Sequence, residues 1–158
     1  RGVVLYRRPL RQFQAHSEMT AHPADLLTPS GSGVYLAPPD LAALRRAADE
    51  AGLAWFSVGL ARVTDKTGLL AACRRELGFP QTFGNNCDAL ADCLQDFSWR
   101  DAPGYVINLT QVAVLARAAP QEFQLLLEIL SDAARYWKKR GAVFMALVDD
   151  QAGELPGL

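Results

Sequence analysis

The sequence predicts an α/β domain, a small three-stranded parallel sheet packed with helices and preceded by an N-terminal extension. Three short apolar runs, at residues 53–59, 105–109 and 142–148, have the length and composition of buried strands. Amphipathic segments long enough to be helices separate them, and strands separated by helices favour parallel pairing through right-handed crossovers. Half of the residues are hydrophobic and 21% are charged, which is the composition of a folded globular domain.

Capping residues and apolar stripes mark the helices that we expect between these strands. Ser, Thr, Asp or Asn before an apolar stripe is the usual start of a helix, and Gly is its usual end. The predicted helices run from Pro38-Pro39-Asp40 through Glu50, from Thr64-Asp65 to Gly78, over residues 87–97 after Asn85-Asn86, over about 111–117, and from Pro120 to about residue 139.

Composition divides the chain into an extension with a linker at 1–34, a domain at 35–150 and a polar tail at 151–158. The extension carries four arginines in its first eleven positions and ends in Thr28-Pro29-Ser30-Gly31-Ser32-Gly33, which is typical of a flexible linker. Val3 to Tyr6 forms either a short edge strand or part of a loosely packed arm.

Charge and hydropathy exclude several classes of protein. Sixteen basic against seventeen acidic residues do not favour a protein that binds nucleic acid directly. No apolar run approaches the roughly 18 residues of a membrane-spanning helix, and the apolar stretch near the start is too short for a signal-peptide core. We therefore expect a cytoplasmic protein that contacts no membrane.

The cysteines and histidines predict neither a disulfide framework nor a metal or cofactor site. Cys73, Cys87 and Cys93 are too few for a framework, no CxxC motif occurs, and both histidines lie in the weakly patterned extension. We expect reduced thiols, with Cys93 in the core and Cys87 at the first position of its helix. Asn108-Leu109-Thr110 matches a glycosylation acceptor, but it ends a predicted buried strand, so we expect it to be unmodified.

The most informative segment is the acidic helix predicted at 87–97. Asp88, Asp92 and Asp96 are spaced four apart and form one stripe, beside an apolar stripe that we expect to face the core: Cys87, Leu90, Leu94 and Phe97. Each like-charged pair at this spacing costs about 0.2–0.5 kcal/mol, and no basic residue lies on this helix to offset the cost. Local stability therefore does not explain the stripe. Three interpretations of the stripe remain. It is a solvated polar face, or a docking surface for a basic partner, or it contains a catalytic acid/base pair, which would need a concave setting.

A longer motif around these aspartates resembles the barstar family of ribonuclease inhibitors. Residues 77–94 read Leu-Gly-Phe-Pro-Gln-Thr-Phe-Gly-Asn-Asn-Cys-Asp-Ala-Leu-Ala-Asp-Cys-Leu. The family pattern is Leu-x-x-Pro-x-aromatic-aromatic-Gly-x-Asn-x-Asp-Ala-Leu-x-Asp-Cys-Leu, and its Gly, Asn, Asp, Cys and Leu positions fall in register here without gaps. A weaker resemblance runs from about Leu53 to Val148; the helix near 39–51 is an addition to it. The family's three-stranded parallel sheet agrees with the fold expected from the residues.

The resemblance implies an inhibitor, not an enzyme, that plugs the active site of a small ribonuclease. In the family, the second helix and the loop before it enter the basic cleft, and aspartates take the place of substrate phosphate. On this chain the implied carboxylates are Asp88 and Asp92, with Asp92 inserted. The expected partner-facing residues are Asp92, Asp88, Thr82, Asn86, Ala91, Asp96 and Tyr136. The alternative is a module with the same fold whose partner is not a nuclease.

Three departures from the family bear on which partner this chain takes. Thr82 replaces an aromatic residue, and Ala91 stands where the family's best-known member has Trp, so contact area of the kind found in interface hot spots is lost. Near the end of the long helix, where that member has glutamates, this chain has Tyr136 and Arg140. These changes favour a different ribonuclease, or another toxin with a basic cleft, over a barnase-type enzyme.

Overall fold

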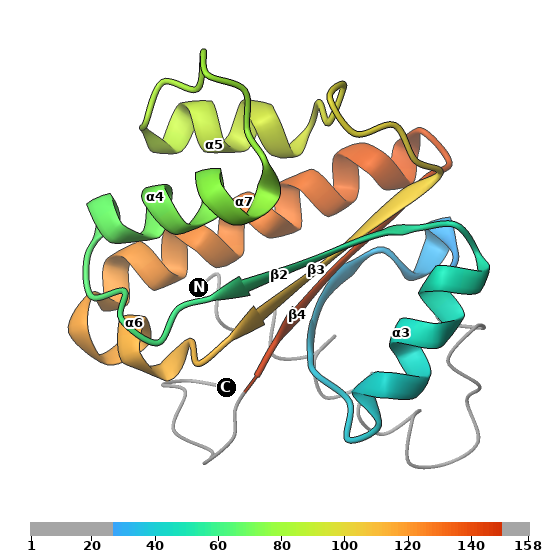
Figure 1. The fold of residues 1–158 in the computed structure, drawn as a ribbon, viewed down its shortest axis with the longest axis horizontal. Helices are drawn as coiled ribbons and strands as arrows, with labels where there is room; N and C mark the ends of the chain where they lie inside the picture. Colours follow the sequence, from blue (N-terminus) through green and yellow to red (C-terminus); the bar gives the residue numbers. More distant parts are fainter. Residues whose placement is uncertain (1–26, 150–158) are drawn as a thin grey trace.

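The computed structural model describes residues 27–149, which form a four-stranded parallel sheet with helices on both faces (Figure 1). The strand order is β1-β4-β3-β2. The strands are β1 (Gly33–Leu36), β2 (Ala54–Gly59), β3 (Gly104–Thr110) and β4 (Val143–Val148). The last three confirm the strands expected from the apolar runs. The expected count of three strands is wrong, because β1 adds a fourth.

The added strand β1 lies at the edge of the sheet beside β4. It pairs in parallel from Gly33 with Met145 to Leu36 with Val148. It is only four residues long, and the strand that holds it is more than a hundred residues further along the chain, so no local pattern marks it. The sheet thus begins two residues before the domain boundary placed at residue 35.

Residues 28–33 are not the flexible linker that their composition suggests. Pro29–Gly31 forms a short 3₁₀ helix, η1. The Ser32 hydroxyl donates to the carbonyl oxygen of Ala142 at 3.3 Å and accepts from the backbone N–H of Phe144 at 3.0 Å. The possible strand at Val3 to Tyr6, the rest of the extension and the tail at 151–158 lie outside the described residues, so the division into three parts stays a prediction.

Helices cover the two faces of the sheet unequally (Figure 1). One face carries α3 (Leu41–Glu50), and the other carries α4 (Lys66–Leu77), α5 (Cys87–Leu94), α6 (Ala113–Ala118) and α7 (Pro120–Lys139). Two apolar clusters result, a large one under α4 to α7 and a small one under α3. The central strand β4 is buried along its whole length, as expected for a parallel strand covered on both faces.

The capping residues behave as the sequence predicts. The side chains of Asp40, Asp65 and Asn86 each accept a hydrogen bond from a backbone N–H in the first turn of α3, α4 and α5. Gly78 ends α4 in the left-handed conformation, with φ of 67°. No helix among residues 27–149 is long and apolar enough to cross a membrane.

Helix α5 is shorter than expected, because it ends at Leu94 instead of Phe97. Phe97 takes a positive φ of 52°, which turns its ring into the core. There it stacks on Tyr105, with ring centroids 4.3 Å apart, and on Phe56, at 5.6 Å. Asp96 therefore lies beyond the helix, and the expected three-residue stripe on one helix is reduced to Asp88 and Asp92.

All three cysteines are free thiols, as expected. Cys73 is buried in the main core, and Cys87 occupies the first position of α5. The expectation that Cys93 is a core residue is wrong, because its side chain is only partly buried. Cys93 lies at the edge between the apolar and the acidic sides of α5.

Candidate docking surface on α5

Three exposed carboxylates form what we call the acidic face: Asp88, Asp92 and Asp96. Asp88 and Asp92 lie one turn apart on α5, whereas Asp96 follows two residues after the helix ends. No lysine, arginine or histidine in residues 27–149 lies within ion-pair distance of any of them. Leu90, Leu94 and Phe97 point the other way and are at most 1% exposed. The carboxylates are thus presented to solvent, as the sequence predicts, on a helix held by its apolar side.

The negative charge of the acidic face acts on its neighbour Cys93. Burial raises the pKa of the Cys93 thiol, and the carboxylates of Asp96 and Asp92 raise it further. Asp96 also accepts a hydrogen bond from the Ser98 hydroxyl at 3.1 Å. Although it lies outside the helix, Asp96 therefore still adds to the negative potential around Asp92.

Two buried aromatic rings hold the segment before α5, residues 79–86, which we call the docking loop. Phe79 and Phe83 are buried, with ring centroids 4.8 Å apart, and the Phe83 N–H donates to the carbonyl oxygen of Pro80 at 3.0 Å. Thr82, which lies between Phe79 and Phe83 in the sequence, is exposed. The loop is thus a turn held by two buried rings, with the residues between Phe83 and α5 exposed to solvent.

The docking loop passes into α5 through two asparagines. Asn85 adopts the left-handed conformation, with φ of 55°, which Asn tolerates better than most residues. The Asn86 Oδ1 accepts a hydrogen bond from the backbone N–H of Ala89 at 2.7 Å. This cap fixes the first turn of α5, where the carboxylate of Asp88 is stabilised by the positive end of the helix.

Two tryptophans that the sequence did not single out for this role anchor the surface. The Trp137 Nε1–H on α7 donates to the carbonyl oxygen of Leu94 at 2.8 Å, which satisfies the last turn of α5. The Trp99 Nε1–H donates to the carbonyl oxygen of Leu77 at 3.1 Å, at the end of α4. In the sequence, Trp137 is one residue of the helix predicted from Pro120 to about residue 139, and a local pattern gives no sign of a bond that spans 43 residues.

Tyr136 lies on α7 and immediately precedes the anchoring Trp137 in the sequence. Its ring packs edge-on against Trp137, with centroids 5.2 Å apart, and the Arg140 guanidinium lies 3.7 Å above its centroid. A cation over an aromatic ring thus stands at the two positions that the family resemblance marked as departures.

The structure brings five of the seven predicted residues together on the docking loop and α5. Thr82, Asn86, Asp88 and Asp92 are exposed there, and Ala91 is partly buried. Asp96 adjoins this group beyond the helix end, whereas Tyr136 belongs to α7.

Taken together, the parallel sheet and the outward-facing carboxylates of α5 define a small α/β protein that presents an acidic surface to solvent. The sequence profile of the family Barstar (barnase inhibitor) matches residues 53–149. That is more than half of the chain, which therefore belongs to the barstar family, whose members are inhibitors and not enzymes. A search of curated proteins gave no match. Strand β1 and helix α3 lie outside the matched residues.

Proposed function

We propose that this chain is an immunity-type inhibitor that blocks the basic active site of a small ribonuclease, or of a related toxin, with its acidic face. In this proposal the docking loop and α5 enter the cleft, and Asp92 takes the place of a substrate phosphate. The expected contact residues are Thr82, Asn86, Asp88, Ala91, Asp92, Asp96 and Tyr136. An inhibitor of this kind protects the cell that makes the nuclease, so we place it in the cytoplasm. It needs no metal or cofactor.

The observation that supports this proposal is the pair of exposed carboxylates on α5 that have no cationic partner within residues 27–149. A cleft that binds RNA phosphates gathers Arg, Lys and His side chains, which form strong charge-assisted hydrogen bonds with carboxylates. Because the cap, the buried rings and the Trp137 bond already order α5, little conformational entropy remains to be lost on binding.

The residues around the acidic face argue for a nuclease that differs from barnase. Thr82 and Ala91 offer little of the aromatic contact area that dominates interface hot spots. Arg140 over Tyr136 adds a cation at the edge of the surface, which would repel a basic rim. We therefore expect the partner to carry neutral or acidic groups where it meets α7.

The test compares inhibition and stability for Asp92→Ala against secreted ribonucleases of the source organism. Removing one partner of a desolvated charge pair weakens association by ~2–5 kcal/mol, a range to which the barnase–barstar complex itself contributed. The free energy of unfolding should change little, and should rise slightly as repulsion from Asp88 is relieved. Asp49→Ala is the matched control, because Asp49 is an exposed carboxylate on α3, away from this surface.

Two outcomes decide between the proposal and its alternative. If Asp92→Ala inhibits the cognate nuclease as well as the wild type does, the inserted carboxylate is wrong. If the wild type inhibits no ribonuclease of its own organism but captures another protein through the acidic face, the chain is an interaction module whose partner is not a nuclease.

A further inference from the structure

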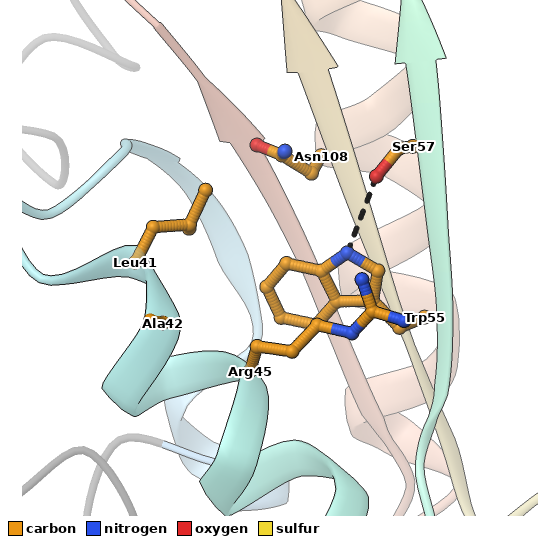
Figure 2. Close-up of a pocket in the computed structure, with 6 residues that line it drawn as sticks. All are labelled: Leu41, Ala42, Arg45, Trp55, Ser57 and Asn108. Carbon is orange, nitrogen blue, oxygen red and sulfur yellow. Dashed lines mark hydrogen bonds between the residues drawn. The ribbon is translucent and has the colours of Figure 1, made fainter.

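A pocket lies between α3 and the sheet, on the face opposite α4, α5 and α7. Its volume is about 400 Å³, within the range typical of small-molecule sites. The lining residues are Leu41, Ala42, Arg45, Trp55, Ser57 and Asn108 (Figure 2). The first three belong to α3, outside the residues that match the barstar family, so the added helix builds one wall of the pocket.

Asn108 is the feature that apolar packing does not explain. It is the buried polar residue of the described core, at 5% exposure, and its Oδ1 has no hydrogen-bond partner. Its strand neighbours are Ser57 on β2 and Leu147 on β4. An amide oxygen left without a donor in such a place destabilises the fold. This oxygen is closed off from solvent, so the amide must turn toward the pocket before a ligand N–H can reach and satisfy it.

The other polar groups converge on the same space. The Trp55 Nε1–H donates to the Ser57 Oγ at 3.3 Å, which fixes the indole plane and leaves the Ser57 hydroxyl proton free to donate. The Arg45 guanidinium lies 5.2 Å from the centre of the Trp55 ring, and no carboxylate in residues 27–149 is within ion-pair distance of it. Figure 2 shows Leu41 and Arg45 projecting from α3 toward the strands that carry Trp55 and Asn108.

We propose that this pocket binds a nucleoside monophosphate. The planar base lies between Leu41 and the Trp55 indole. Once the Asn108 amide turns toward the pocket, a base N–H donates to its Oδ1, and a base carbonyl or ring nitrogen accepts from the Ser57 hydroxyl. The phosphate pairs with Arg45 at the rim. A single nucleotide is favoured over a nucleic acid strand, because the pocket holds one base and the net charge of −1 gives no path for a polyanion. This site is independent of the proposed inhibition.

The test follows the indole N–H resonance of Trp55 by NMR in the full chain, identified by its loss in Trp55→Phe. Titration with uridine monophosphate should shift it saturably, with a dissociation constant below about 1 mM, as expected for a ligand of this size. Uridine, which lacks the phosphate, and ribose 5-phosphate, which lacks the base, should each bind roughly tenfold more weakly or worse.

Variants separate this site from unspecific binding. Arg45→Gln, Ser57→Ala and Asn108→Leu should each weaken binding by roughly tenfold. Arg46→Gln is the matched control, because Arg46 is exposed on the same helix but does not line the pocket. Asn108→Leu should unfold at a temperature no lower than the wild type, since it removes an unsatisfied polar group; Ser57→Ala changes an exposed side chain and leaves the fold intact.

Three results would overturn the proposal. The first is that the Trp55 resonance of the full chain does not respond to uridine monophosphate, which is also the result expected if another part of the chain covers the pocket. The second is that Arg45→Gln, Ser57→Ala and Asn108→Leu bind the nucleotide as well as Arg46→Gln does. Finally, a short uridine oligonucleotide binds more tightly than the mononucleotide, which would make the ligand a nucleic acid strand.

Discussion

Single residues decide how the two carboxylates of α5 are presented. Asn86 caps the helix through one hydrogen bond of 2.7 Å, and Asp88 in the first turn is stabilised by the positive helix end. Asp92 lies one turn further, where that stabilisation has faded. The helix therefore stabilises the charge of Asp92 less than that of Asp88. A cationic partner would stabilise Asp92 more.

One prediction at the scale of the residue concerns Cys73 and alkaline pH. Burial, and to a lesser extent the nearby Cys87, raise the pKa of the Cys73 thiol from 9.0 to about 12. Between these values the unfolded chain has lost this proton while the folded chain keeps it. The free energy of unfolding should therefore fall as the pH rises above about 9, by up to about 1.4 kcal/mol per pH unit, and this contribution should be constant at lower pH.

Urea unfolding under reducing conditions, repeated between about pH 8 and 11, measures this slope. Cys73→Ala is the reference, because Tyr35 and Tyr105, whose pKa values are also raised by burial, titrate equally in both proteins. Equal slopes for the wild type and Cys73→Ala would contradict the prediction.

At the scale of the element, the length and position of α5 depend on α7. The helix has eight residues, fewer than an isolated helix needs to be stable in water, so tertiary contacts must hold it. Leu90 and Leu94 bury its apolar side, and the Trp137 indole satisfies its last turn. The acidic face is therefore presented by a helix that has little stability of its own.

Trp137→Phe tests this dependence, since it keeps an aromatic ring and removes the N–H that donates to the Leu94 carbonyl. We expect a loss of ~0.5–1.5 kcal/mol in the free energy of unfolding, the usual worth of one such hydrogen bond. Amide hydrogen exchange should speed up in α5 more than in β4. Uniform acceleration throughout the domain would show instead that Trp137 supports the core as a whole.

At the scale of the whole molecule, the sheet separates two surfaces with different chemistry. The acidic face lies on the side of α4 to α7, and the pocket with Arg45 and Asn108 lies on the side of α3. The net charge of −1 is too small to attract a basic partner over a long distance. Any electrostatic steering must therefore come from the local cluster of Asp88, Asp92 and Asp96.

This arrangement predicts how association with the cognate nuclease depends on salt. Raising sodium chloride from about 0.05 to 0.5 M shortens the screening length from about 14 Å to about 4 Å, so the association rate should fall severalfold. The dissociation rate should change much less, because close contacts are weakly screened. Stopped-flow mixing measures both rates. An association rate that does not vary with salt would show that the acidic face does not steer the encounter.

The sequence alone determined the elements whose signals are local. The apolar runs placed β2, β3 and β4, the capping residues placed the starts of α3, α4 and α5, and helical periodicity turned Asp88 and Asp92 away from the core. Each of these features follows from residues within one or two turns or along one strand, where propensity and burial agree. The family motif at 77–94 belongs to the same group, since it is one continuous segment.

Tertiary structure decided the features that depend on residues far apart in the chain. Strand β1 exists because β4 supplies its hydrogen bonds, and α5 ends at Leu94 because Phe97 gains more by stacking on Phe56 and Tyr105 than by extending the helix. The pocket needs α3 to lie across β2 and β3. Burial and cross-strand pairing outweigh a few tenths of a kcal/mol of local preference, and a sequence pattern does not show which distant residues provide them.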